Sequence, residues 1–133
     1  MVQFWTGNHD LLRKAAKRGY KIVNSYFKYT YLNFNHDRIT PGLEYDFEPI
    51  PLEKAYAFNP IPEGLTMQEQ KQIIGIGCQT WGEWIPQVED MYRMIYPYWA
   101  ALAETGWTGN KRKNYNRFVR SMDYYLTRWI DKN

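Results

Sequence analysis

Residues 73–84 read IIGIGCQTWGEW, and this stretch decides the fold of the 133-residue chain. It opens with an apolar, glycine-containing run without alternation, which is typical of a strand covered on both faces, as in a parallel sheet. The run ends in Trp81 and Trp84, which stand on either side of Glu83. Because ligands of parallel α/β sheets bind at the carboxyl ends of strands, we expect a binding site there.

The indole rings and the carboxylate at this strand end favour carbohydrate as the ligand. An indole offers a flat apolar surface to the C–H face of a pyranose, while a carboxylate accepts hydrogen bonds from hydroxyl groups. A core role for Trp81 and Trp84, and a solvated rim role for Glu83, are the alternatives. A charge at a strand end needs a partner or water, and a sugar hydroxyl is a suitable partner.

The first 25 residues predict a strand, a helix and a second strand with short connections. Residues 2–5 (VQFW) form the first strand, and a helix with one apolar face follows from His9 to Arg18. Gly19 is a typical helix end, and residues 20–25 form the second strand. This is a βαβ unit, so the strands are parallel and the fold class is α/β.

Residues 26–66 then form a long aromatic and proline-rich excursion. Loops of this length within a compact domain are usually functional. Residues 51–56 predict a helical turn within it. Thr66 begins a short helix before the third strand, since Glu69 stands at the spacing of a capping box.

The C-terminal third is predicted to be helical. Apolar residues at helical spacing from Val88 to Ala103 indicate a helix that packs on the sheet and bends at Pro97. A last helix runs from about Lys113 to Ile130, with the basic run at 111–113 as its solvated start. Three tryptophans lie on helical stripes and are predicted to belong to the core: Trp99, Trp107 and Trp129.

The composition of the chain excludes several classes of partner and site. The chain is 44% apolar and 18% aromatic, which is ample for a core and leaves aromatic rings to line a wet site. The net charge is +3 and the basic residues are scattered, so we expect no nucleic-acid partner.

The apolar runs of the chain are shorter than the ~20 residues that a membrane span needs. The single cysteine, Cys78, excludes an intrachain disulfide, and the two histidines have no partner at metal-ligand spacing, so neither metal nor cofactor is expected.

Three doubly covered parallel strands cannot close a barrel and leave open edges. A complete eight-stranded α/β barrel takes about 250 residues, roughly twice this length. We therefore expect a partial (β/α)8 TIM barrel.

Several segments stand in a familiar order: residues 2–5 (VQFW), 31–33 (YLN), 58–62 (FNPIP), 74–85 and 96–104 with Trp107. Together they resemble the C-terminal portion of the catalytic domain of glycoside hydrolase family 20, the β-N-acetylhexosaminidases. The resemblance implies about the last three strands of the barrel with their helices, plus a C-terminal helix. Residues 1–133 are then the C-terminal part of a single catalytic barrel, with 26–66 as a substrate-side loop.

The resemblance also implies an activity. Family members hydrolyse terminal non-reducing β-linked N-acetylglucosamine or N-acetylgalactosamine by substrate-assisted retaining catalysis, in which the acetamido oxygen attacks the anomeric carbon. An adjacent Asp-Glu pair orients the acetamido group and acts as general acid and base. This chain has no Asp-Glu dipeptide, and its reversed pair, Glu89-Asp90, falls in a predicted helix. The chain alone is therefore predicted to be inactive.

Site residues carry over from the matching motifs. The resemblance implies that Tyr31 donates a hydrogen bond to the acetamido carbonyl. It also implies that the rings of Trp5 and Trp81 pack against the acetamido methyl group and the sugar face, and that Glu83 binds the outer hydroxyls of the sugar. Asn33 stands where many members have Asp and is expected to bind substrate as well. Because Tyr31 lies in an aromatic cluster, plain aromatic packing remains its alternative role.

Two other functions stay open. The chain could be a non-catalytic carbohydrate-binding module, or an interaction fragment whose edges pair with the missing N-terminal part of the barrel or with another copy. The family resemblance suggests a periplasmic or secreted parent protein, although the first residues, MVQFWTGN, do not read as a signal peptide.

Overall fold

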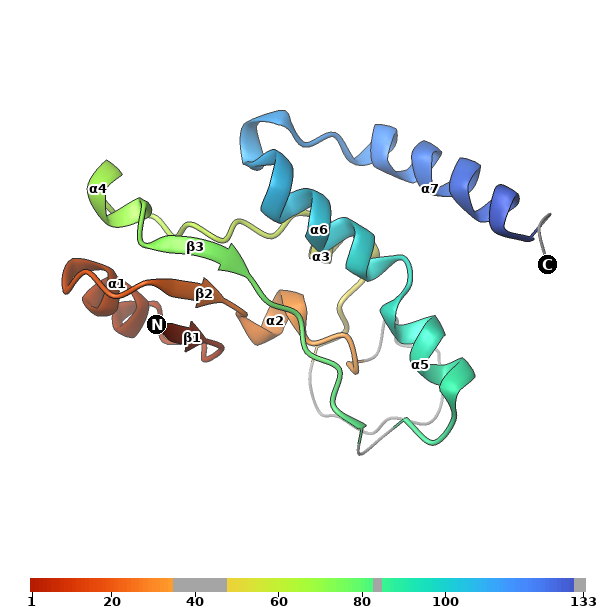
Figure 1. Cartoon of the computed structure of the whole chain (residues 1–133), viewed down its shortest axis with the longest axis horizontal. Coiled ribbons are helices and arrows are strands. Elements are labelled where there is room, and N and C mark those ends of the chain that lie inside the picture. The colour runs from red at the N-terminus through yellow and green to blue at the C-terminus, as the bar shows by residue number, and fades with distance from the viewer. Residues whose placement is uncertain (35–47, 83–84, 131–133) are drawn as a thin grey trace.

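The computed structural model describes residues 1–34, 48–82 and 85–130 (Figure 1). Three parallel strands form one sheet in the order β1-β2-β3. They are β1 (Val2–Phe4), β2 (Ile22–Asn24) and β3 (Ile73–Ile76). The helices are α1 (His9–Lys17), α2 (Phe27–Thr30), α3 (Leu52–Tyr56), α4 (Met67–Gln70), α5 (Val88–Ile95), α6 (Tyr98–Thr108), the 3-10 turn η2 (Asn110–Arg112) and α7 (Tyr115–Ile130). The predicted α/β class is confirmed.

The βαβ unit forms where the sequence predicts it. The Asn8 side-chain oxygen accepts a hydrogen bond from the Asp10 N–H (3.1 Å) and so caps α1. Gly19 follows the helix with φ of +78°, a conformation that glycine adopts without cost. One face of α1 packs against the sheet in a core cluster of Phe4, Leu12, Ala16, Ile22 and Leu65. Burial of these apolar residues fixes the helix on the sheet.

The predicted capping box at Thr66 is also present. The Thr66 hydroxyl accepts from the Glu69 N–H (3.3 Å), and the Glu69 carboxylate accepts from the Thr66 N–H (2.8 Å). These two bonds satisfy amide groups that the start of a helix leaves free. Helix α4 thereby begins at a defined residue just before β3.

Strand β3 differs from the prediction that both of its faces are covered. Ile22 pairs with Ile73 and Val23 with Gly75, so Ile74 is an extra residue in a bulge, and its side chain is 52% exposed. The strand after the bulge lies close to β2. A Cβ added at Gly77 would lie 2.5 Å from the Ser25 hydroxyl oxygen, so glycine permits this approach.

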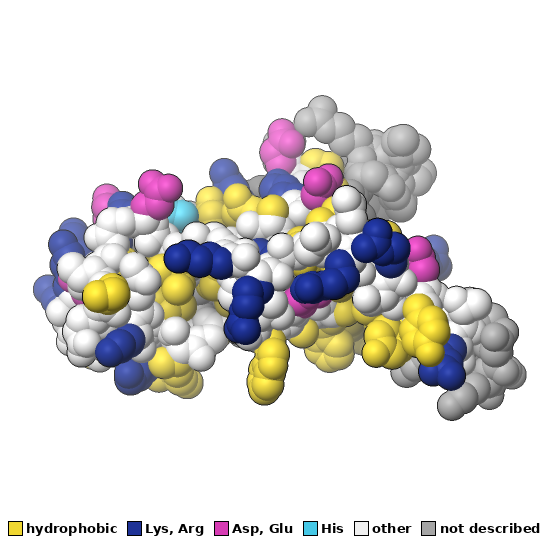
Figure 2. Space-filling view, turned by 90° about the horizontal axis from the view of Figure 1, so that it is seen from above, with side chains coloured by type: hydrophobic (Ala, Val, Ile, Leu, Met, Phe, Trp, Pro, Cys, Tyr) yellow, Lys and Arg dark blue, Asp and Glu magenta, His cyan; other side chains and the backbone are white. Residues whose placement is uncertain are grey.

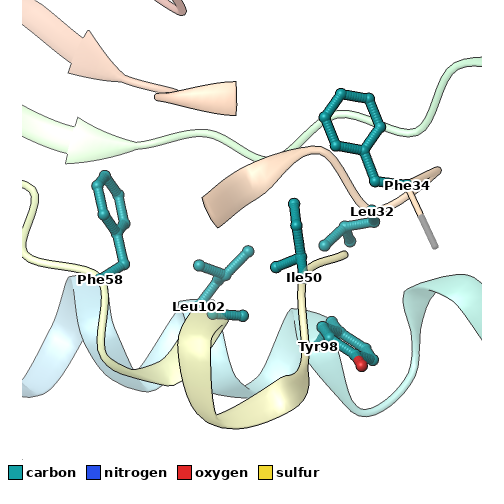
Figure 3. Packing of buried hydrophobic residues seen from close by; sticks show 7 residues of the cluster. Leu32, Phe34, Ile50, Phe58, Tyr98 and Leu102 are labelled. Carbon is teal, nitrogen blue, oxygen red and sulfur yellow. The ribbon is translucent and has the colours of Figure 1, made fainter. Parts of the chain in front are cut away.

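The excursion at 26–66 is less loop-like than its sequence suggests, because its described parts build the main core. Leu32 and Phe34 from its start, and Ile50 and Phe58 from its second half, are buried against α6. Figure 3 shows these side chains gathered around Leu102 and Tyr98 of that helix. The excursion is therefore held at both of its described ends.

The predicted long helix is two helices, since α5 ends at Ile95 and α6 begins at Tyr98, on either side of Pro97. After the break the helical phase is reset. The buried face of α6 carries Tyr98, Ala101, Leu102 and Thr105. The prediction that Trp99 and Trp107 belong to the core is wrong, since Trp99 is exposed and Trp107 is 92% exposed. The side chain of Trp129 lies outside the described residues.

The basic run at 111–113 is only partly solvated. Lys111 and Arg112 are exposed in η2, but Lys113 is half-buried. Its ammonium group donates to the carbonyls of Tyr56 (2.6 Å) and Phe58 (2.9 Å), at the end of α3. The prediction of a solvated helix start is wrong for Lys113. This residue instead joins the start of α7 to the excursion.

Tyr56 completes this junction. Its hydroxyl donates to the Glu104 carboxylate (2.9 Å) and accepts from the Asn114 N–H (2.7 Å). Its ring packs against Phe118 of α7, with centroids 5.0 Å apart. We refer to Tyr56, Phe58 and Lys113 as the anchor, because they tie α3, α6 and α7 together.

The surface mixes charge types. Figure 2 shows Lys and Arg side chains spread along one face, with Asp and Glu among them and hydrophobic side chains between. Within the part of the chain that the structure describes, no helix is both long enough and apolar enough to span a membrane.

Candidate carbohydrate site

The predicted site residues that the structure describes follow the carboxyl ends of the three strands. Trp5 comes directly after β1, Tyr31 follows β2 through the short helix α2, and Trp81 comes a few residues after β3. Because the strands are parallel, these ends meet at one edge of the sheet. Glu83 and Trp84 lie outside the described residues.

A short backbone ladder brings the segments of Tyr31 and Trp81 together. The Gln79 N–H donates to the Thr30 carbonyl (3.0 Å), and the Leu32 N–H donates to the Gln79 carbonyl (2.8 Å). Tyr31 and Gln79 form a parallel bridge between these bonds. The ring centroids of Tyr31 and Trp81 lie 6.2 Å apart, and the ring planes are tilted by 56°. Trp5, Tyr31 and Trp81 are called the wall below.

Tyr31 is held by aromatic rings on its other side. Its ring makes edge contacts with Phe27 and Phe34, at centroid distances of 6.1 and 5.5 Å. Burial raises the pKa of the Tyr31 hydroxyl, and a side-chain hydrogen bond with Trp81 opposes this by a smaller amount. The hydroxyl therefore stays protonated at neutral pH and can donate a hydrogen bond to a ligand carbonyl.

The two tryptophans of the wall leave much of their rings open. Trp5 is 55% exposed and Trp81 is 47% exposed. The backbone of Trp5 is fixed, because its carbonyl accepts from the Phe27 N–H (3.2 Å), and Phe27 in turn contacts Tyr31. The open indole face of Trp81 lies beside the ring of Tyr31, so this pair can bind a ligand that has both an apolar face and a polar substituent. Trp5 makes no ring contact with this pair among the described residues and lines a hollow with Leu11 and Leu12 of α1.

Asn33, predicted to bind substrate, lies deeper than the wall. Its side chain is only 1% exposed, between the core residues Leu32 and Phe34. Its side-chain oxygen accepts a hydrogen bond from the Trp81 N–H (3.4 Å). The structure thus places Asn33 in contact with the backbone of the wall.

Sequence reasoning missed Gln79, whose backbone forms the ladder. Its side-chain oxygen is buried and has no hydrogen-bond partner among the described residues. The side chain lies near Gly77. Ser25, directly after β2, lies near Gly77 as well, and its hydroxyl accepts from the Gln3 side chain (3.1 Å). The alternation Gly75, Gly77, Gln79 is the signal that could have placed Gln79 on this polar face.

Cys78 points to the opposite, helix-covered side. It packs against the main core, and the Trp99 indole N–H donates to its sulfur (2.8 Å). Burial raises the pKa of the Cys78 thiol, and the bond from Trp99 opposes this less strongly. A protonated, core-packed thiol is a poor nucleophile, so Cys78 serves as a small side chain of the core. In the described ranges, no group of three or more His, Cys, Asp or Glu residues could hold a metal ion.

Comparison with known families decides the wider assignment. The model of the family described as glycosyl hydrolase family 20, catalytic domain, matches residues 1–110. The chain belongs to glycosyl hydrolase family 20. This confirms the resemblance drawn from residues 2–5, 31–33, 58–62, 74–85 and 96–104.

Curated relatives carry the corresponding names. A beta-hexosaminidase from Porphyromonas gingivalis (strain ATCC BAA-308 / W83) is 33% identical over 108 residues, which cover 68% of this chain and 14% of the relative. A beta-hexosaminidase from Vibrio furnissii is 33% identical over 110 residues, covering 80% of this chain and 18% of the relative. The chain thus spans less than a fifth of the length of these two relatives.

Solved structures share the fold. The family 20 exo-β-N-acetylglucosaminidase from Vibrio harveyi, in complex with N-acetylglucosamine, superposes with a TM-score of 0.82 at 28% identity, covering 95% of this chain and 20% of that enzyme. A second β-N-acetylhexosaminidase has a TM-score of 0.82 at 24% identity, covering 93% of this chain and 26% of that one. The α/β arrangement with its small parallel sheet therefore occurs within family 20 enzymes.

Proposed function

We propose that this chain is the C-terminal part of the catalytic barrel of a β-N-acetylhexosaminidase and supplies the sugar-binding half of its pocket. In this proposal β1, β2 and β3 are the last three strands of a (β/α)8 barrel, residues 1–133 belong to that one domain, and 26–66 form a substrate-side loop. The placement of Tyr31 and Trp81 at one sheet edge of a family 20 chain carries the proposal.

The pocket would act on a terminal, non-reducing, β-linked N-acetylglucosamine or N-acetylgalactosamine. The Tyr31 hydroxyl donates a hydrogen bond to the acetamido carbonyl, which holds that oxygen for attack on the anomeric carbon and stabilises the ring that forms. Trp5 and Trp81 cover the acetamido methyl group and the sugar face. Glu83 accepts hydrogen bonds from the outer hydroxyls. The neutral hydroxyl of Tyr31 supports its part in this scheme.

The general acid would come from elsewhere. Substrate-assisted hydrolysis needs a carboxyl group to protonate the leaving oxygen, and the family resemblance assigns this to an Asp-Glu pair that the sequence lacks. We therefore propose that this pair belongs to a segment outside these 133 residues. A coding sequence upstream of Met1 that contains a strand ending in Asp-Glu would agree with this assignment.

Hydrolysis of a chromogenic N-acetylglucosaminide tests whether the general acid lies outside this chain. The chain alone should give no turnover above the uncatalysed rate. Co-expression with the N-terminal part of a family 20 barrel should restore it, and Tyr31→Phe in the restored protein should lower kcat by about 100-fold or more, since it removes a donor aimed at the reacting oxygen. Turnover by the chain alone at the rate of a complete enzyme would contradict the proposal.

A second candidate is a non-catalytic carbohydrate-binding or interaction fragment, and one feature favours the interaction role. A cavity of about 160 Å³ lies beside β1, lined by residues 2–6 and by apolar residues of α1 and β2: Leu11, Leu12, Ala15 and Ile22. The free edge of β1 and this apolar hollow could pair with the missing part of the barrel or with another copy. Light scattering of the purified chain distinguishes a dimer from a monomer.

A further inference from the structure

The wall depends on one hydrogen bond that is not part of its backbone ladder. Two rungs join the segments, from Gln79 to Thr30 and from Leu32 to Gln79. After Leu32 the backbone turns away, because the Phe34 N–H donates to the Tyr31 carbonyl (3.2 Å). The next N–H of the ladder, on the segment that contains Gln79, is that of Trp81. It therefore donates to a side chain and not to a backbone carbonyl.

Asn33 supplies that acceptor. Its oxygen takes the Trp81 N–H at 3.4 Å, so the side chain extends the ladder by one rung beyond the point where the backbone leaves it. The flanking residues Leu32 and Phe34 are both buried in the main core, which fixes the position of Asn33. The bond is partly buried, so the Trp81 amide would carry part of a desolvation penalty if it lost this acceptor.

Burial also separates Asn33 from a ligand. Its side chain is 1% exposed, whereas the ring of Trp81 is 47% exposed. Contact with a sugar would be made by the indole, while Asn33 acts on the backbone behind it. We propose that Asn33 is a positioning residue, which fixes the Trp81 indole beside Tyr31 through the Trp81 amide. This inference rests on the proposed function of the wall.

Hydrogen exchange of the Trp81 amide, followed by nuclear magnetic resonance on the full 133-residue chain, measures this bond without any ligand. In Asn33→Ala the amide should exchange about fivefold to tenfold faster, the factor that one hydrogen bond contributes. Asn33→Asp keeps an acceptor oxygen and should hold the exchange rate within about threefold of the original. Unchanged Trp81 exchange in Asn33→Ala would overturn the inference.

Asn59→Ala is the matched control. Asn59 is an exposed asparagine whose side-chain oxygen also accepts a backbone N–H, that of Ile61 (3.1 Å), away from the wall. This substitution should leave Trp81 exchange unchanged. If Asn33→Ala does not fold, Asn33→Asp remains decisive, because a folded Asp variant with a fast-exchanging Trp81 amide would also overturn the inference.

N-acetylglucosamine titration separates this role from direct sugar contact. Positioning predicts that affinity falls about fivefold in Asn33→Ala and is recovered in Asn33→Asp, in parallel with Trp81 exchange. Weaker affinity in both variants with unchanged Trp81 exchange would mean direct contact and would overturn positioning. Faster Trp81 exchange in Asn33→Ala, in a chain that binds no sugar, supports the positioning bond and counts against the proposed function alone.

Discussion

The wall and the anchor both contain aromatic residues and both hold the excursion, but the rings are open to solvent in the wall and buried in the anchor. The anchor buries Tyr56 and Phe58 under α6 and α7. The wall leaves Trp5 and Trp81 about half open at the sheet edge. Buried rings contribute to folding, whereas open rings are available to a ligand. Substitutions in the two regions should therefore have separate effects, on stability in one and on sugar binding in the other.

The largest stability effect should come from Phe58→Ala. Phe58 is buried and its ring stacks on Tyr29 at 5.1 Å, so truncation removes apolar contact and leaves a cavity. The free energy of unfolding should fall by about 3–5 kcal/mol in urea denaturation. Trp107→Ala is the control, since its ring is 92% exposed and its loss should change stability by no more than about 0.5 kcal/mol. Equal losses in the two variants would contradict the described core.

Lys113→Met should have the next largest effect. It keeps the aliphatic stem but removes the two hydrogen bonds to the Tyr56 and Phe58 carbonyls, so unfolding should become easier by about 1–3 kcal/mol. Lys111→Met, in the same basic run but exposed, should be close to neutral. If both substitutions prove neutral in urea denaturation, Lys113 does not anchor α7.

Trp81→Ala should lower sugar affinity and leave stability nearly unchanged, the opposite of the two anchor substitutions. Sugar affinity should fall about tenfold or more, because a large ring of the wall is lost, while stability should change by less than about 1 kcal/mol. Trp99→Ala removes a similarly exposed ring from α6 and should leave affinity unchanged. Calorimetric titration with N-acetylglucosamine and urea denaturation give the two readouts. A stability loss in Trp81→Ala as large as that in Phe58→Ala would remove the contrast between wall and anchor.

The smallest effect concerns alkaline pH. Burial raises the pKa of Tyr31 above its ordinary value of 10.0, so in the pH range just above 10 the unfolded state has lost a proton that the folded state keeps. Stability is therefore full below about pH 10 and falls as pH rises through the higher folded value. The fall should be slightly smaller in Tyr31→Phe. A fall of the same size in both proteins would show that Tyr31 does not contribute.

The sequence predicted those features that depend on local patterns. The apolar face of α1, the end at Gly19 and the capping box at Thr66 each follow from residue spacing and were found in place. The family resemblance named Trp5, Tyr31 and Trp81 as site residues, and in the structure they follow the carboxyl ends of the three parallel strands. The family assignment followed from these motifs and is confirmed by the match to residues 1–110.

Features that depend on distant partners were not predictable in this way. Lys113 looks like a surface lysine in a basic run, yet its acceptors are backbone carbonyls 57 and 55 residues away. The partner of Asn33 is likewise a backbone amide, 48 residues away. A backbone group carries no side-chain signal in the sequence. The core prediction for Trp99 assumed one helix with continuous spacing through Pro97. The structure has two helices there, which end and begin on either side of Pro97.

The most direct test of the central claim is a comparison of two sugars on one chain. We predict that N-acetylglucosamine, titrated into the isotopically labelled 133-residue chain, saturably shifts the resonances of Trp5, Tyr31 and Trp81. Glucose, which lacks the acetamido group, should bind about tenfold or more weakly, because Tyr31 then has no carbonyl to donate to. Equal responses to the two sugars, or shifts confined to residues outside the wall, would contradict the account.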